Sequence, residues 1–424
     1  MKSVGLAFEQ APAAAVPLRF LLTAPWFLAL AGLVLVFGGA DALASRWTPA
    51  LLAVTHLVTL GFMSMVMIGA LFQLLPVVAG APVRGAQWVA GIVHPALTAG
   101  TLSLAAGFLL GSFWALRAAA ALLALAFAVF IAAAGAALLR STVRDPSVQA
   151  MRLALIALIV TVALGLSLAA ALGWRVSVPL LGITAQHAAW GLAGWTVLLA
   201  IGVALQVVPM FQLTPSYPKA VASFLAPGLF IALAGWSVAF WLGWTAVAAT
   251  LGVLVALLVG AFAIATLVLQ HRSRRRHDNP TFLTWRAGML GLLLAAAVWI
   301  GRDGLDTVAA NRAAVLLGVL FLAGFAASVI AGMLYNIVPF LLWIDLRRRA
   351  HGRVPHMKQI LPDTPARTHA WLHGASLAAL VAAALWPAWL VPVAGVLVVS
   401  ANALLGTILL QATLNARRVA PAST

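Results

Sequence analysis

The chain has 424 residues, of which 64% are hydrophobic and 8% are charged, and it contains no cysteine. This composition excludes a soluble globular protein and indicates a polytopic membrane protein. The lack of cysteine excludes disulfides, thiolate metal sites and thiol catalysis. The net charge of +17 lies mostly in loops between apolar runs, which membrane topology explains, so we expect no nucleic-acid partner.

A helix needs about 20 apolar residues to cross a bilayer. Long continuous apolar runs favour helices over barrel strands, because the lipid interior offers no partners to backbone polar groups. The sequence therefore predicts an all-α polytopic membrane protein with the lipid bilayer as its partner. Its twelve predicted spans are 20–40, 51–76, 89–111, 115–139, 151–172, 185–209, 220–243, 246–270, 283–301, 313–343, 368–386 and 388–413.

The basic residues predict the orientation of these spans. One set of loops carries most of them, including Arg140 and Arg144, Arg272 to Arg276, Arg347 to Arg353, and Arg417 with Arg418. The other set has only scattered charges. The positive-inside rule then places both termini in the cytoplasm, with the chain in a bacterial-type cytoplasmic (inner) membrane.

One stretch occurs three times, as a glycine, three residues, an amide, two residues and a proline. The copies are Gly69 to Gln73 to Pro76, Gly202 to Gln206 to Pro209, and Gly332 to Asn336 to Pro339. A fixed period of this length indicates copies of one structural unit. We expect a single membrane domain, 1–424, with pseudo-repeats at 1–145, 146–280 and 281–424. We also expect each motif proline to end its helix.

The candidate functional residues are histidines, because every Asp and Glu lies in a loop or at the end of a span. His56 lies 20 residues before Pro76, and His187 lies 22 residues before Pro209. The third copy has no such histidine. Histidine is the commonest metal and haem axial ligand, so matched depth on equivalent helices predicts that His56 and His187 ligate iron or copper. The alternative is an interior hydrogen bond between helices.

Three further histidines lie in or at the edge of spans. His94 and His373 fall in the cytoplasmic half, where a second haem between them is an option. His369 and His373 are four residues apart on one helical face and can share a metal ion. They have no third ligand nearby in the sequence.

Twelve spans in three groups of four, with histidines on the second and sixth, resemble the haem-copper oxidase subunit I superfamily. The stretch Thr55 to Met63, followed by Gly69, Pro76 and Gly80-Ala81-Pro82, is similar to that superfamily's second helix. The resemblance implies that His56 ligates a low-spin haem. His187 falls where the sixth helix of that superfamily carries its first copper ligand.

The chain also departs from that superfamily. The tenth helix has no histidines near Leu317 and Val319, the seventh span has no histidine pair, and Gly191 stands where a tyrosine is expected. The ligand set of a complete dioxygen or nitric-oxide reductase is therefore not present.

The length and span number resemble NnrS-type membrane proteins, which are associated with haem, copper and nitric oxide. This resemblance implies haem b, copper as a further metal, and a small gaseous or redox ligand. The expected role is nitric-oxide tolerance or electron transfer within the membrane. Two other functions stay open: a transporter or channel for a metal or small solute, which repeats fit, and a structural or assembly subunit of a respiratory complex. The sequence indicates no protein partner.

Overall fold

The computed structural model describes residues 12–274, 279–302, 304–349 and 354–419. Glu9, Asp278, Asp303, Arg276 and Arg353, which the sequence places in loops or termini, lie outside these residues. The described part of the chain is helical and contains no β-strand. It holds twelve helical segments that are long and apolar enough to cross a membrane, one for each predicted span. For these residues, the prediction of an all-α fold with twelve helices long and apolar enough to span a membrane is therefore confirmed.

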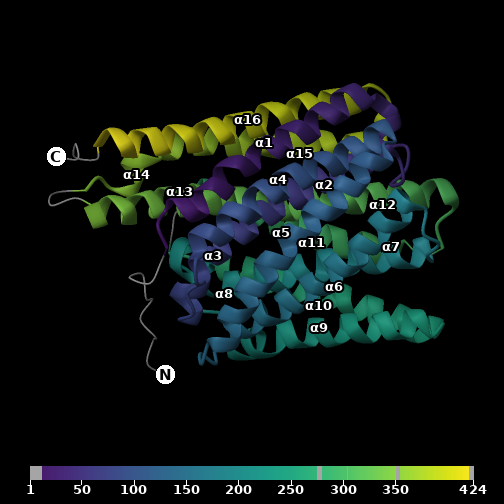
Figure 1. The fold of residues 1–424 in the computed structure, drawn as a ribbon, viewed down its shortest axis with the longest axis horizontal. Helices are drawn as coiled ribbons and strands as arrows, with labels where there is room; N and C mark the ends of the chain where they lie inside the picture. The colour runs from purple at the N-terminus through teal and green to yellow at the C-terminus, as the bar shows by residue number, and fades with distance from the viewer. Residues whose placement is uncertain (1–11, 275–278, 303, 350–353, 420–424) are drawn as a thin grey trace. The chain divides into compact units, whose positions relative to one another are not determined.

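Several of these segments are composed of more than one helical element, as labelled in Figure 1. In chain order the elements are α1 and η2 (Ala15–Gly38, Gly39–Leu43), α2, η3 and α3 (Pro49–His56, Leu57–Ser64, Met65–Ala79), α4 (Ala86–Leu110), α5 (Phe113–Arg140), α6 (Pro146–Trp174), α7, η4 and α8 (Leu180–Ala189, Trp190–Val197, Leu198–Gln212), α9 (Lys219–Trp241), α10 (Thr245–His271), α11 (Pro280–Gly301), α12, η5 and α13 (Thr307–Val319, Leu320–Ala327, Ser328–Arg349), the short α14 (Met357–Ile360), α15 (Asp363–Leu385) and α16 (Pro387–Val419).

The contacts between residues divide the chain into two compact units. The first contains Leu74–Arg275 and Met289–Leu305, and the second contains Pro12–Gln73, Arg276–Gly288 and Asp306–Thr424. Helices α3 and α11 each contribute residues to both units. The single membrane domain and its pseudo-repeat boundaries stay predictions.

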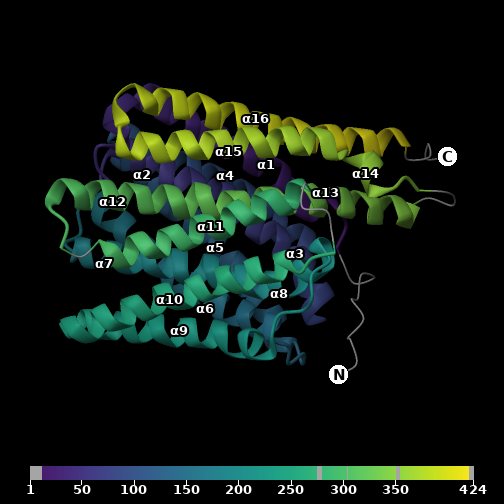
Figure 2. The same ribbon diagram turned by 180° about the vertical axis from the view of Figure 1, so that it is seen from behind.

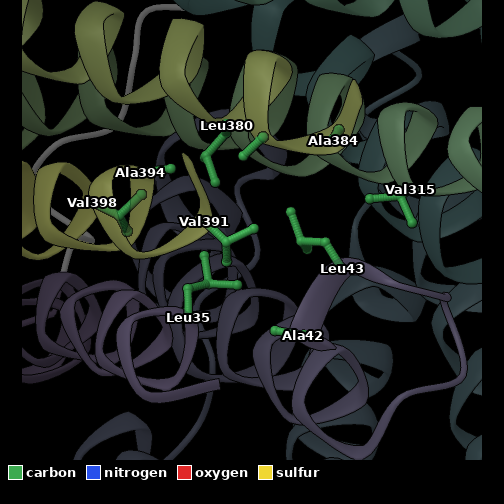
Figure 3. Close-up of a cluster of buried hydrophobic side chains, with 10 residues drawn as sticks. Leu35, Ala42, Leu43, Val315, Leu380, Ala384, Val391, Ala394 and Val398 are labelled. Atoms are coloured by element: carbon green, nitrogen blue, oxygen red, sulfur yellow. The ribbon is translucent and has the colours of Figure 1, made fainter. Parts of the chain in front are cut away.

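In the second unit, α16 packs along α1 and α15, as both ribbon views show (Figures 1 and 2). Gly32 and Gly395 allow α1 and α16 to approach closely, since a Cβ on either glycine would lie 2.8 Å from the carbonyl oxygen of the other. Small residues of this kind are the usual means of close helix packing in membranes. A buried apolar cluster joins α1, η2, α12, α15 and α16 (Figure 3).

In the first unit, α4 packs along α5, and α9 packs along α10. Helix α6 packs against α5, α8 and η4. A tight turn at Gly111 (φ 62°) connects α4 to α5, and one at Gly243 (φ 71°) connects α9 to α10. This left-handed backbone conformation is one that glycine adopts without the steric cost of a Cβ. The turns therefore fix which helices become antiparallel neighbours.

The three motif prolines do not end their helices, so that prediction is wrong. Pro76, Pro209 and Pro339 all lie inside α-helices. Helices α3 and α8 end three residues later, and α13 continues for ten residues to Arg349. Proline removes one backbone hydrogen bond and clashes with the preceding turn. In membrane helices, neighbouring groups and local backbone adjustments satisfy the freed carbonyl, so the helix can continue.

Candidate functional site

The three motif helices share a π-helical segment that the sequence analysis did not predict. The segments η3, η4 and η5 each span eight residues and begin 19 residues before the motif proline. Each has a glycine at its fifth position, followed by an aromatic residue: Gly61-Phe62, Gly194-Trp195 and Gly324-Phe325. A glycine–aromatic pair 15 residues before each proline was the available signal. π-helical turns are rare and occur frequently at functional sites, so the matched positions mark these segments as candidates.

The motif glycines have one packing role in all three copies. A Cβ on each would lie within 3.4 Å of a backbone carbonyl oxygen on the first helix of its predicted group: Gly69 faces Pro17, Gly202 faces Ser147, and Gly332 faces Thr281. Glycine therefore permits a close helix crossing at the same place in each copy. The repeated motif has one local arrangement, whatever the larger repeat boundaries are.

Two of the three motif amides form a hydrogen bond at the same crossing point. Gln206 Nε2 donates to Ser147 Oγ at 3.0 Å, and Asn336 Nδ2 donates to Thr281 Oγ1 at 2.7 Å. In the first copy the facing residue is Pro17, which has no hydroxyl group, and the buried Gln73 Oε1 has no hydrogen-bond partner. The amide is therefore a bridge to the preceding helix in the second and third copies.

His56 is the last residue of α2 and directly precedes η3 in the second unit. It is half-buried, and its Nδ1 lies 2.8 Å from the carbonyl oxygen of Leu52, one turn earlier. A carbonyl oxygen only accepts, so Nδ1 carries the proton. In the neutral ring, Nε2 then holds the lone pair. Metal-ligating histidines typically donate the other ring N–H in this way.

His187, in the first unit, also carries its ring proton on Nδ1. It lies on α7, three residues before η4, and its Nδ1 is 3.0 Å from the carbonyl oxygen of Thr161 on α6. Gly165 makes room for the ring, because a Cβ there would lie 2.9 Å from the ring Cε1. By the same argument, Nε2 of the neutral ring holds the lone pair. The two histidines therefore share a degree of burial and a tautomer, although His187 lies two residues farther from its motif proline than His56 does.

The third motif helix lacks its own histidine but contacts two histidines of α15. His373 Nε2 lies 2.8 Å from Ser328 Oγ, and His369 Nδ1 forms a short hydrogen bond with the Tyr335 hydroxyl. The two imidazole rings stack at 5.9 Å with an interplanar angle of 17°. These contacts are interior hydrogen bonds between helices, which was the alternative to metal ligation. The sequence predicted the shared face of His369 and His373 but not their two partners.

His369 is fully buried, and its Nε2 has no hydrogen-bond partner. A buried polar atom without a partner is costly, about 1–3 kcal/mol. His373 is also buried, at 5% exposure. Each ring thus has one nitrogen paired with a side chain of α13, and the prediction that the pair binds a metal stays a prediction.

The remaining candidate, His94, lies in α4 next to Pro95 in the first unit and is half-buried. His56, His369 and His373 belong to the second unit, whereas His94 and His187 belong to the first. The predicted ligation of iron or copper by His56 and His187, and the option of a second haem between His94 and His373, therefore stay predictions. Among the described residues, no three histidine or carboxylate side chains gather closely enough to hold a metal ion.

On the third motif helix, the positions that correspond to the missing histidines are apolar. Val319 and its neighbour Leu316 pack against the buried cluster of Figure 3. Val319, one of the two positions at which the resemblance would require a histidine, thus has an apolar packing role in the second unit.

Comparison with known proteins adds no relative. No protein-family model matches the chain, and no curated protein sequence matches it.

Proposed function

We propose that the protein is a haem-binding integral membrane protein in which His56 and His187 ligate haem b, with copper as a further metal for this histidine set. The observation that carries the proposal is the shared tautomer of the two histidines. Each donates Nδ1–H to a backbone carbonyl, which leaves Nε2 basic in the neutral ring. Both histidines lie within three residues of a π-helical segment on equivalent helices.

The chemistry of the donor set supports haem better than a hard cation. The described carboxylates lie in loops or toward helix ends; Asp145 and Asp306, for example, cap the N-termini of α6 and α12. Magnesium and calcium prefer oxygen ligands, whereas neutral imidazole suits iron and copper. Bound haem would supply a redox-active iron that also binds small gaseous ligands. The residues of this chain would hold it, orient the imidazoles and exclude water.

This proposal leads to a role in nitric-oxide tolerance or in electron transfer within the membrane. The resemblance of the second and sixth helices to haem-copper oxidases, and of the whole chain to NnrS-type proteins, is its basis. The apolar positions on the tenth helix favour a protein that does not complete oxygen or nitric-oxide reduction.

The test is an absorption spectrum of the purified full-length protein with iron and copper analysis. We expect a Soret band, a reduced-minus-oxidised difference spectrum of the b type, and weakening of both in His56→Ala and His187→Ala. His271→Ala is the matched control, because His271 is an exposed residue at the end of α10, and we expect it to keep the full band. A folded, monodisperse and colourless wild-type protein would refute the proposal.

A further inference from the structure

Two arginines and three aromatic side chains meet where α5 begins and α6 ends, within the first unit. Arg117 Nε donates to the carbonyl oxygen of Gly173 at 2.9 Å. The Arg117 guanidinium also lies over two indole rings, 4.8 Å from the Trp114 centroid and 5.5 Å from the Trp174 centroid. Hydrogen bonding and cation–π attraction together hold this side chain in place.

The second arginine joins the same junction from the other helix. Arg175 is the C-cap of α6, and its guanidinium lies 4.9 Å from the centroid of Phe113, the first residue of α5. Arg175 adopts a left-handed backbone conformation (φ 57°), which glycine would adopt at lower cost. The arginine side chain at this position is therefore not explained by the turn itself. We call these six residues, Phe113, Trp114, Arg117, Gly173, Trp174 and Arg175, the arginine junction.

No described carboxylate of the first unit lies near the arginine junction. The unit's one described carboxylate, Asp145, caps the opposite end of α6, 30 residues before Arg175. A helix of that length separates the two ends by roughly 45 Å, far beyond the screening length of about 8 Å at physiological ionic strength. The two positive charges are thus not neutralised by a described acidic side chain of their own unit.

The surroundings of the junction are those of a membrane–water boundary. Trp114 is 76% exposed and Trp174 is 49% exposed, and both lie at the ends of membrane-length helices. Tryptophan concentrates at the level of lipid headgroups. The bond to Gly173 uses one of the five N–H groups of the Arg117 guanidinium, and such a planar fork suits the two oxygens of a phosphate.

We propose that the arginine junction binds the phosphate of an anionic phospholipid headgroup. The predicted topology places the arginine junction on the outer side of the membrane, where the positive-inside rule disfavours arginine. Membrane orientation therefore does not explain the presence of its two arginines. At the ends of two membrane-length helices, the junction should lie at the level of the lipid phosphates. It offers two guanidinium groups that lie over aromatic rings. This site is independent of haem binding.

The test titrates the full-length protein in detergent with phosphatidylglycerol and phosphatidylcholine and counts bound lipids by native mass spectrometry. We expect tighter binding of phosphatidylglycerol. Each arginine near a lipid surface contributes roughly five-fold in affinity. Arg175→Gln should thus weaken phosphatidylglycerol binding about five-fold, and Arg117→Gln/Arg175→Gln about 30-fold. Binding of phosphatidylcholine should not change.

Arg140→Gln/Arg144→Gln is the matched control, because it removes two exposed charges from the same unit at the other end of α5. It should leave the tightest phosphatidylglycerol site intact. An equal loss in this control, or no lipid preference in the wild type, would overturn the proposal. Displacement of the lipid by inorganic phosphate at tenfold excess would also overturn it, in favour of a site for free anions. Arg175→Gln keeps the Arg117–Gly173 bond, so it separates lipid binding from any folding defect of the double variant.

Discussion

Tyr335 and Tyr217 are the two tyrosines of the chain, and both are buried with hydrogen-bonded hydroxyl groups. The two hydroxyl groups have different partners, His369 and Thr266, and these partners keep different hydrogen bonds when the tyrosine hydroxyl is removed. Without Tyr335, His369 has two unpaired nitrogens at full burial. Without Tyr217, Thr266 still donates to the carbonyl oxygen of Phe262 at 2.8 Å.

We therefore expect Tyr335→Phe to destabilise the protein by about 1–3 kcal/mol, the cost of an unsatisfied buried polar group. Tyr217→Phe should cost less. Burial raises the pKa of Tyr217, so its hydroxyl stays neutral and the variant removes no charge. Thermal unfolding of the purified variants, followed by tryptophan fluorescence, measures both losses. Equal losses would mean that leaving both His369 nitrogens unpaired has no extra cost, which would contradict this prediction.

For single residues, the sequence predicts which side chains are neighbours on one helix, but it does not predict their hydrogen-bond partners on other helices. The spacing of His369 and His373 predicts a shared face, and their rings do stack. Their partners Tyr335 and Ser328 lie 34 and 45 residues away, and no local pattern records such a distance. The same limit applies to Thr161, which lies 26 residues from His187 and accepts its hydrogen bond.

At the scale of elements, the π-helical segment η3 contains a glycine that permits close packing against α1. A Cβ on Gly61 of η3 would overlap the side chain of Phe27 on α1, with the Phe27 Cβ at 2.6 Å. Because Phe27 is itself buried, it has little room to move. We expect Gly61→Ala to destabilise the protein by roughly 1–3 kcal/mol, as overpacking generally does.

Gly91→Ala in α4 is the control, since no atom lies within 4 Å of the Cβ it would add. There, alanine should stabilise the helix by roughly 0.5–1 kcal/mol, because glycine is the poorer helix former. Denaturant unfolding of both variants tests the contrast. A loss of stability in Gly91→Ala that matches the loss in Gly61→Ala would show that packing at η3 is not special.

The bilayer explains why the elements themselves were predictable. Membrane thickness fixes the length of each apolar run, and all twelve predicted spans are found as helices. The π segments η3, η4 and η5 were missed because apolar periodicity does not separate α from π turns. The motif prolines were wrongly assigned as helix ends, because the rule for soluble helices does not allow for neighbours that satisfy the freed carbonyl.

For the molecule as a whole, the loop charges predict the orientation in the membrane, and this prediction can be tested directly. The chain contains no cysteine, so a single introduced thiol is a unique chemical label. Ser177 and Ser216 are exposed serines in successive loops of the first unit, on either side of α7, η4 and α8. They should therefore lie on opposite sides of the membrane.

The positive-inside rule places Ser177 outside and Ser216 in the cytoplasm, next to Lys219. In intact cells, a membrane-impermeant maleimide should modify Ser177→Cys but not Ser216→Cys, and permeabilisation should make the two equal. The reverse pattern would place both termini outside, because an even number of spans keeps them on one side. It would also move the arginine junction to the cytoplasmic leaflet, where arginine is ordinary, and so remove one argument for lipid binding there.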